Sequence, residues 1–339
     1  MTTRLRRALY PLIACLAAVL LTSCSHGLQA AGAHSGRTLI FALDQAEDHP
    51  SYIALENFSE RLEQATDGRW DVRVYPNASL GNQQETVQLV GDGSVDMTVA
   101  SGTLLENLND DFRTLGLPLI FDSVDDQMEV LSDDSLVGDL FSSLESSNHL
   151  TVLGGFTQGE RHLYTRSGPI ERPKDLAGMK VRVQESDLMI NMLGSMGSSP
   201  TPLSYAEVYT AVQSGVLDGA ENNLISYMTE GHNEVAKHVA LTGHQIGTDY
   251  IVINSDVLGD MTEQDRRTFE REWQTTVEKH TELWLQRTDE AQDQAEEEGT
   301  EFTDVDEHAF RDALRTVLDG ELQDPDVKEL YERIRDHQQ

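Results

Sequence analysis

Cysteine is almost absent from this chain of 339 residues: Cys15 and Cys24 are the only two, and both lie near the amino terminus. Their scarcity excludes a disulfide-built scaffold and a cysteine-ligated zinc module for the rest of the chain. Positive charge is scarce as well, because 25 lysine and arginine residues face 59 acidic ones and leave a formal net charge of −34. Nucleic acid repels a polyanion of this kind, so we expect no nucleic-acid partner.

Long apolar runs are also absent, apart from one near the amino terminus. Residues 8–21 are apolar, broken only by Pro11, and they follow three arginines within the first seven residues. The run is too short to span a hydrocarbon core of about 30 Å, but it fits the apolar region of a signal peptide. It ends in Leu21-Thr22-Ser23-Cys24, which resembles a bacterial lipobox. We therefore predict a lipoprotein signal peptide over residues 1–23, with lipidation of Cys24.

The residues after this cysteine, 24–37, are rich in Gly, Ala, Ser and His and predict a flexible tether. We expect an extracytoplasmic protein that is periplasmic or on the outer face of the cytoplasmic membrane, held there by the lipid on Cys24. The alternative is an ordinary signal peptide cut near Ala30 or Ala31, with Cys24 discarded. Cys15 is removed in either case, so no thiol is left for catalysis or metal binding.

The remaining chain alternates predicted strands and helices, which is typical of an α/β fold. A hydrophobic content of 38% is enough for a core, and the length suits one large or two medium domains. From Thr262 to about Glu298 the pattern stays helical, and some 35 residues give a helix of about 50 Å. Such a helix exceeds one small domain and indicates an element that runs across two lobes. The predicted strands are 38–43, 70–75, 97–100, 151–154, 161–165, 179–183, 239–241 and 250–254. A helix is predicted over residues 204–213, with a capping box from Ser204 to Glu207 at its start and Gly215 as its stop.

Signatures of catalysis are missing. The sequence contains no nucleophile elbow, no phosphate-binding loop and no dinucleotide-binding glycine motif. The spacing of His232, His238 and His244 is not that of a zinc site. We therefore expect no enzyme, no catalytic residue, no cofactor and no metal. A secreted hydrolase or lyase acting on acidic sugars is the alternative from another class.

Specific detail is concentrated between residues 175 and 223. There the chain contains DLAGMKVRV from Asp175, SPTP from Ser199, SYAEVY from Ser204 and GVLDGAENN from Gly215. Together these motifs resemble the solute-receptor (DctP) family of tripartite ATP-independent periplasmic (TRAP) transporters. The resemblance covers the mature chain from Arg37 to the last helices, and the stretch from Arg182 to Asn223 is its most specific part.

The resemblance implies a periplasmic-binding-protein-like fold of two α/β lobes, joined by hinge strands and by the long helix. We predict lobe I over 38–158 and 248–287, and lobe II over 159–247 and 288–339. Such a receptor is expected to be a monomer that closes on a small organic acid and delivers it to small and large membrane subunits. A receptor that feeds a chemosensory kinase is the alternative partner class.

The ligand-binding residues follow from the same resemblance. Arg182, at the end of its strand, matches the arginine that binds the ligand carboxylate, and a guanidinium suits that task because its donors are planar and bidentate. Arg161 matches a second arginine, with Arg166 as competitor if the register differs. Asn222 matches an asparagine that bonds ligand oxygens, and Asn223 is a near substitute.

Four further positions have weaker support. His244 and Tyr205 fall where the family lines its cleft, although each is as readily explained by packing. Glu85 is either the N3 residue of a helix cap or an acceptor for sugar hydroxyls, and Asp44 is a similar candidate. The resemblance to sugar-acid receptors favours a hexuronate such as D-glucuronate or D-galacturonate, with a C4-dicarboxylate or another monocarboxylate as the alternative.

Overall fold

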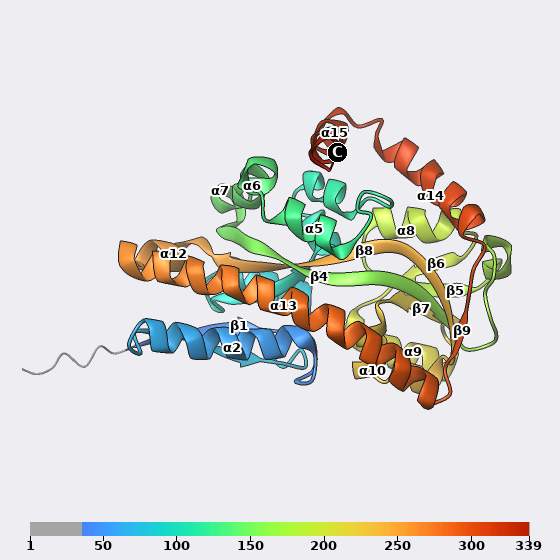
Figure 1. Cartoon of the computed structure of the whole chain (residues 1–339), viewed down its shortest axis with the longest axis horizontal. Coiled ribbons are helices and arrows are strands. Elements are labelled where there is room, and N and C mark those ends of the chain that lie inside the picture. The colour runs from blue at the N-terminus through green and yellow to red at the C-terminus, as the bar shows by residue number, and fades with distance from the viewer. Residues whose placement is uncertain (1–35, 339) are drawn as a thin grey trace, which may run out of the picture. The chain divides into compact units, whose positions relative to one another are not determined.

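The computed structural model describes residues 36–338 (Figure 1). The predicted signal peptide, Cys24 and nearly all of the predicted tether lie outside the described residues. Within the described range, no helix has the length and apolar character that crossing a membrane requires. Residues 37–339 form one compact unit.

One mixed sheet of nine strands organises this unit. The strand order is β2-β1-β3-β8-β4-β7-β5-β6, and β9 pairs with β8. The bounds are β1 Arg37–Ala42, β2 Trp70–Tyr75, β3 Met97–Ser101, β4 Leu150–Thr165, β5 Lys180–Val183, β6 Ser199–Pro202, β7 Gly219–Asn222, β8 His238–Asn254 and β9 Glu301–Thr303. These bounds confirm the α/β class and most of the predicted strands.

Parallel strands lie at the two ends of the sheet and long antiparallel ones cross its middle. β1 pairs in parallel with β2 and β3, and β5 pairs in parallel with β6 and β7. β4 and β8 pair with each other in antiparallel orientation along most of their length. Each therefore begins in one lobe and ends in the other, so the two-lobe prediction is confirmed.

The sequence suggested four short strands where the structure has only β4 and β8. The prediction was wrong because Gly154, Gly155 and Gly159 interrupt the apolar pattern without ending the strand. The pairing instead shifts register between Val152 and Gly154 and between Thr157 and Glu160. Such irregularities bend and twist a strand, as a crossing between lobes requires.

Helices cover both faces of the sheet (Figure 1). The bounds are α2 Pro50–Ala65, α3 Gln83–Gly91, α4 Gly102–Leu105, α5 Val124–Leu131, α6 Asp134–Ser142, α7 Glu145–Asn148, α8 Asp187–Ser195, α9 Val208–Ser214, α10 Leu224–Thr229, α11 His232–Val235, α12 Ser255–Asp260, α13 Glu263–Glu297, α14 Glu307–Glu321 and α15 Pro325–His337, with 3₁₀ turns η1 Asp110–Gly116, η2 Pro173–Leu176 and η3 Tyr205–Glu207.

The long helix predicted from residue 262 is α13, and it packs on both lobes. Thr262 caps its first turn by accepting a hydrogen bond from the Asp265 backbone. Its first half places Phe269 and Trp273 in a core with β1, β2 and α2. Its second half places Trp284 in a separate core with β7, α9 and α10. One rigid element thus contributes to both hydrophobic cores.

The helix predicted over residues 204–213 begins later than expected. Ser204 and Glu207 form a side-chain hydrogen bond, but Ser204 makes no capping bond to the backbone. A 3₁₀ turn therefore precedes α9, and the predicted capping box is wrong. The predicted stop is confirmed, because Gly215 adopts the left-handed conformation at φ 78°.

The two last helices pack on different parts of the molecule. α14 contacts α8, whereas α15 contacts η1 and α6. Arg335 on α15 reaches Asp122 at 3.7 Å and the Ile120 carbonyl at 3.3 Å. The last helix, α15, therefore packs on the lobe that also contains β1.

Gly159 in β4 provides a test of how tightly the crossing region is packed. Its φ is +59°, and a Cβ at this position would lie 2.6 Å from Nε1 of Trp284. We expect Gly159→Ala to lower the free energy of unfolding by about 2–4 kcal/mol, from left-handed strain plus overpacking. Urea unfolding measures this. Gly68→Ala is the control, because its φ is +73° but nothing lies within 4 Å of the added atom; equal losses in both variants would contradict the packing argument.

Candidate functional site

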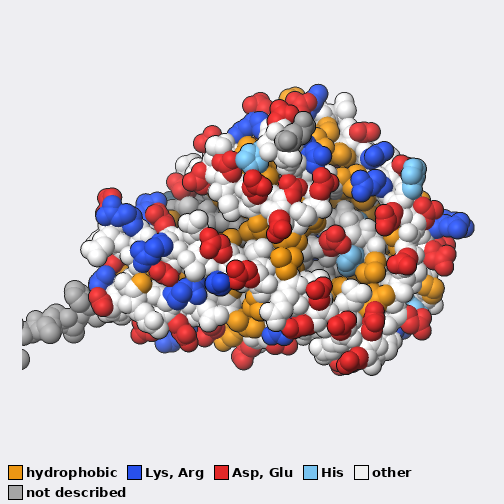
Figure 2. All heavy atoms as spheres, viewed as in Figure 1, with side chains coloured by type: hydrophobic (Ala, Val, Ile, Leu, Met, Phe, Trp, Pro, Cys, Tyr) orange, Lys and Arg blue, Asp and Glu red, His pale blue; other side chains and the backbone are white. Residues whose placement is uncertain are grey.

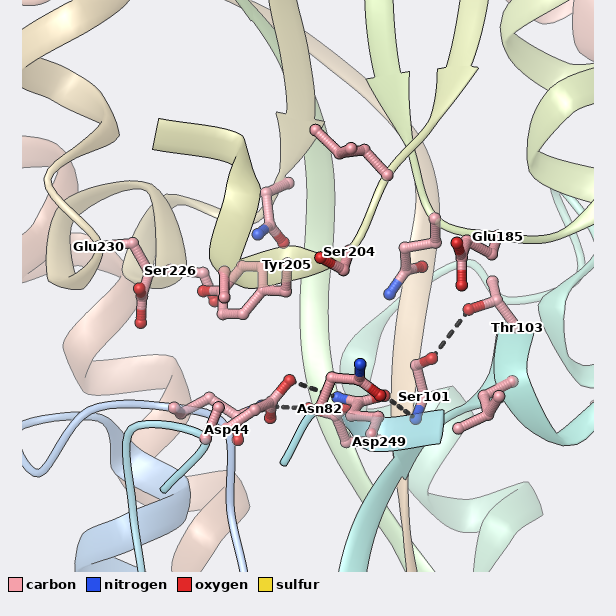
Figure 3. Close-up of a pocket in the computed structure, with 18 of the residues that line it drawn as sticks. Asp44, Asn82, Ser101, Thr103, Glu185, Ser204, Tyr205, Ser226, Glu230 and Asp249 are labelled. Carbon is pink, nitrogen blue, oxygen red and sulfur yellow. Dashed lines mark hydrogen bonds between the residues drawn. The ribbon is translucent and has the colours of Figure 1, made fainter. Parts of the chain in front are cut away.

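A cavity of about 450 Å³ lies between the two lobes, and residues from both contribute to it (Figure 3). This volume is in the range of small-molecule sites. The carboxyl ends of β1, β3 and β5 reach it, which is where open α/β sheets bind ligands.

Hydrogen-bonding side chains dominate the cavity wall. Of the 25 residues that line it, nine carry an amide, five a hydroxyl, five a carboxyl group and two a guanidinium. Such a wall suits a ligand that offers many donors and acceptors and little apolar surface. The lining residues are Asp44, Gln45, Asn77, Ala78, Asn82, Gln83, Gln84, Ser101, Thr103, Leu104, Gln158, Arg161, Arg182, Gln184, Glu185, Leu203, Ser204, Tyr205, Ala206, Glu207, Asn222, Asn223, Ser226, Glu230 and Asp249.

Arg182 enters the cavity from β5. Its strand neighbours Val181 and Val183 are fully buried in the core, so alternation along the strand turns Arg182 the other way. Only 4% of the residue is exposed, and its Nε donates to the carbonyl of Leu203 at 2.9 Å. Among the described residues no carboxylate forms an ion pair with it, and burial lowers the pKa of this arginine. The site therefore contains a desolvated positive charge that lacks a direct counter-ion.

Arg161 also lines the cavity, but its charge is already paired. Its Nε and Nη2 donate to the two carboxylate oxygens of Glu221 at 2.6 and 2.9 Å, and both residues are almost completely buried. Its Nη1 donates to Oε1 of Gln158 at 2.6 Å. Burial raises the pKa of Glu221, but Arg161 and the hydrogen bond to His244 outweigh it and lower the pKa to about 2. Arg161 is thus a fixed part of the wall, in contrast to Arg182.

His244 and Glu85 do not line the cavity. His244 is buried behind the Arg161–Glu221 pair, with its Nε2 3.5 Å from Glu221 and its Nδ1 2.9 Å from the Thr242 hydroxyl. Glu85 completes a capping box on α3: its carboxylate accepts from the Asn82 backbone at 3.0 Å, and its own N–H donates to Asn82 at 2.9 Å. The structure therefore places Glu85 in the cap of α3, and it places His244 against Glu221, outside the cavity wall.

Asn222 and Tyr205 lie on the wall of the cavity. The Oδ1 atom of Asn222 accepts from the backbone and side chain of Asn223, so its Nδ2 is the group left for a ligand. Asn223 itself caps α10 by accepting from the Ser226 backbone. The buried hydroxyl of Tyr205 has no hydrogen-bond partner among the described residues. Arg166, the alternative to Arg161, is exposed and outside the lining residues.

Asp44 lies across the cavity from Tyr205, Ser226 and Glu230 (Figure 3). Its Oδ2 accepts from Gln83 at 2.8 Å, whereas its buried Oδ1 has no partner among the described residues. Burial and the nearby Asp249 carboxyl group raise its pKa to about 7. Burial likewise raises the pKa of Asp249 to about 6.

Several lining residues escaped the sequence analysis, chiefly Gln45, Gln83, Gln158, Glu230 and Asp249. In a chain with 59 acidic residues, a single aspartate in a strand carries little information. The signal available was position: Gln45 follows Asp44 at the end of β1, and Gln158 precedes Arg161 in β4. Asp249 could not be found in this way because its strand was predicted to begin one residue later.

The charged side chains of the protein are predominantly acidic. Figure 2 shows red side chains spread over the visible face, with blue ones interspersed. Such a negatively charged surface repels an anion at long range. At 0.1 M salt this repulsion is largely screened beyond a distance of about 10 Å. Attraction to an anionic ligand therefore depends on the buried arginines inside the cavity.

The two α/β lobes, the crossing strands and the polar cavity between them define a solute-binding receptor. The chain matches the model for bacterial extracellular solute-binding proteins, family 7 (DctP), over residues 41–324. It belongs to this family, and it is a TRAP-type extracytoplasmic solute receptor. A solute-binding protein of Chromohalobacter salexigens is 32% identical over 292 residues, which is 86% of each chain.

Solved structures of the same type are also similar. A TRAP periplasmic solute-binding protein from Anaerococcus prevotii with bound D-glucuronate has a TM-score of 0.85 and 33% identity, covering 88% of this chain and 97% of its own. Another from a Bradyrhizobium species, in complex with D-galacturonate, has a TM-score of 0.84 and 30% identity, covering 88% of this chain and 100% of its own. The predicted family is confirmed.

Proposed function

We propose that this receptor binds a hexuronate such as D-glucuronate or D-galacturonate, without chemical conversion, and delivers it to the TRAP membrane subunits. The observation that carries the proposal is Arg182, a buried guanidinium that has no carboxylate partner among the described residues and lies in a cavity lined by amides and hydroxyls. A uronate supplies one carboxylate for that charge and several hydroxyl groups for the rest of the wall. The hexuronates bound by the similar structures support the choice.

Binding follows from the chemistry of the wall. The ligand carboxylate accepts hydrogen bonds from the Nη groups of Arg182, and Asn222 donates through Nδ2. Arg161 adds positive electrostatic potential to the cavity, and its two hydrogen bonds to Glu221 hold the Arg161 side chain in place. Charged hydrogen bonds contribute on the order of 1.5–3 kcal/mol each, so a few of them account for micromolar binding, about −8 kcal/mol, after the costs of association.

The proposal includes a closing motion of lobe I (38–158, 248–287) against lobe II (159–247, 288–339), with α15 moving with lobe I because it packs on η1 and α6. The bends in β4 and β8 are the natural hinge, because these strands connect the two walls of the cavity. Closure excludes water and strengthens the charged contacts. We also propose that the receptor acts as a monomer, tethered to the membrane through a lipid on Cys24.

A thermal-shift screen of organic acids tests the ligand class. D-Glucuronate or D-galacturonate at about 100 times its dissociation constant adds about 2.7 kcal/mol to the free energy of unfolding. We expect a rise in Tm on the order of 5 °C for a domain of this size. Succinate and lactate at equal concentration are the controls. A shift with a C4-dicarboxylate and none with either uronate would overturn the proposal, and so would turnover of a uronate by the purified protein.

A further inference from the structure

The end of the cavity formed by β1 and β8 contains two hydrogen-bond acceptors without donors. Oδ1 of Asp44 and Oε1 of Gln45 are both buried, and neither has a partner among the described residues. The two residues are adjacent in the chain, directly after β1, and both line the cavity. Gln45 as a whole is only 5% exposed. Unsatisfied buried acceptors are costly, so a ligand that donates to them gains affinity.

Neighbouring groups fix which atoms of these side chains are already hydrogen-bonded. Oε1 of Gln83 accepts from the Ser101 backbone N–H at 2.9 Å, so the amide group of Gln83 must donate to Oδ2 of Asp44. The amide group of Gln45 donates to Asp249 at 3.2 Å, which leaves its oxygen free. Oε1 of Gln158 accepts from Arg161, so its amide also donates to Asp249, at 2.6 Å.

The electrostatic environment at the end of the cavity that contains Asp44 and Gln45 differs from that around Arg182. The charges that principally shift the pKa of Asp44 are Asp249 and Glu230, both acidic. Arg161 is the basic group that lowers the pKa of Asp249, but Glu221 already pairs with it. Arg182 and Arg161 are the only basic residues among those that line the cavity in the described part of the chain. The Asp44 end is therefore rich in carboxyl groups and hydrogen-bond acceptors.

We propose that Asp44 and Gln45, backed by Asp249, bind hydroxyl groups at the end of the ligand away from its carboxylate and reject a second carboxylate there. The inference rests on the proposed function and narrows it to monocarboxylates with a hydroxylated far end. An ionised carboxylate has no hydrogen to donate, and it meets the carboxyl groups of Asp44, Asp249 and Glu230, which line the same cavity. A hydroxyl group satisfies the open acceptors without adding charge.

Calorimetry with matched ligands tests the proposal. A hexuronate and its aldarate share the carbon skeleton, but the aldarate carries a second carboxylate at the far end and, having no aldehyde, does not close to a pyranose ring; the Asp44 variants below separate the effect of the carboxylate from that of the ring. We expect the protein to prefer D-galacturonate over galactarate, or D-glucuronate over glucarate, by at least ~100-fold, because the aldarate leaves buried acceptors without donors.

Two substitutions at Asp44 separate its hydrogen bond from its charge. Asp44→Ala removes the acceptor and should weaken uronate binding about tenfold. Asp44→Asn should keep the contact with Gln83 through the amide oxygen and turn its NH₂ group to the cavity, so the preference over the aldarate falls at least ~tenfold. Asp139→Asn, an exposed aspartate on α6 outside the cavity, is the control and should leave the preference intact.

The outcomes distinguish this inference from the function on which it rests. If the unaltered protein binds a uronate but Asp44→Asn leaves the preference over the aldarate unchanged, the assignment of Asp44 is wrong and the proposed function stands. If the unaltered protein binds the aldarate as tightly as the uronate, the rejection of a second carboxylate is overturned. If it binds neither uronate, both proposals fail.

Discussion

Arg182→Ala lowers the affinity for the uronate at least about 100-fold while leaving the ligand-free protein folded. The ligand carboxylate loses its charged partner inside a desolvated cavity, and breaking a buried pair in this way costs about 3–5 kcal/mol. Because Arg182 has no carboxylate partner among the described residues, its removal breaks no ion pair in the free protein. Isothermal titration calorimetry measures the affinity, and urea unfolding without ligand measures the stability.

The combination of the two measurements is what identifies a binding arginine. A structural arginine would lose stability on substitution, whereas Arg182→Ala should lose affinity and retain, or even gain, stability. Arg166→Ala is a matched control, since this arginine follows β4 but is exposed and outside the lining residues. Unchanged uronate affinity in Arg182→Ala would remove Arg182 from the site.

Glu221→Ala has the opposite signature, a large loss of stability. Glu221 is fully buried and accepts both hydrogen bonds of the Arg161 fork, so its removal leaves a buried guanidinium without its counter-ion. We expect the free energy of unfolding at pH 7 to fall by about 3–5 kcal/mol. Glu160→Ala is the control: it lies next to Arg161, but its side chain is 59% exposed. Equal stability of the two variants would contradict this account.

The Arg161–Glu221 ion pair also predicts that the free energy of unfolding falls at acidic pH. The pKa of Glu221 is about 2 in the folded protein, below its ordinary value of 4.5. A lowered folded-state pKa contributes stability that is present above the unfolded pKa and is lost as pH falls through the folded one. The contribution of Glu221 should therefore disappear between about pH 4.5 and pH 2, as measured by unfolding at a series of pH values. Glu221→Gln should show a smaller loss over this window than the unaltered protein, and identical pH profiles would contradict the assignment.

Local features of the fold were predictable from the sequence, whereas its long-range pairing was not. Pro50, Asn82 and Thr262 mark helix starts with side chains that fit the role, and the structure has helices that begin at or just after them. The crossing strands β4 and β8 were divided because glycines at their bends resemble turns. Nothing in a local pattern reveals that a distant partner strand keeps such a segment extended.

The candidate site shows the same limit. Arg182 was found because it stands inside a motif of the family that the sequence resembles, and Arg161 because it matches the second arginine of that family. Their difference could not be predicted: among the described residues Glu221 forms an ion pair with Arg161 and none with Arg182, which depends on β4 and β7 lying side by side. Gln45 was missed, like Asp249, because the hydrogen bond that joins them links residues 204 positions apart in the chain.

The order of strands in the sheet has a consequence for folding. β3 bonds to β8, and Met97 pairs with Ile253, so the lobe that starts the chain lacks its central strand until residue 254 is available. α15 then adds its contacts with η1 only at the very end of the chain. The first lobe therefore cannot complete its folding before β8 has been synthesised. Strand pairings between residues so far apart in the sequence also form slowly. A chain that ends before β8 should leave both lobes incomplete, which makes this receptor a single cooperative unit despite its two halves.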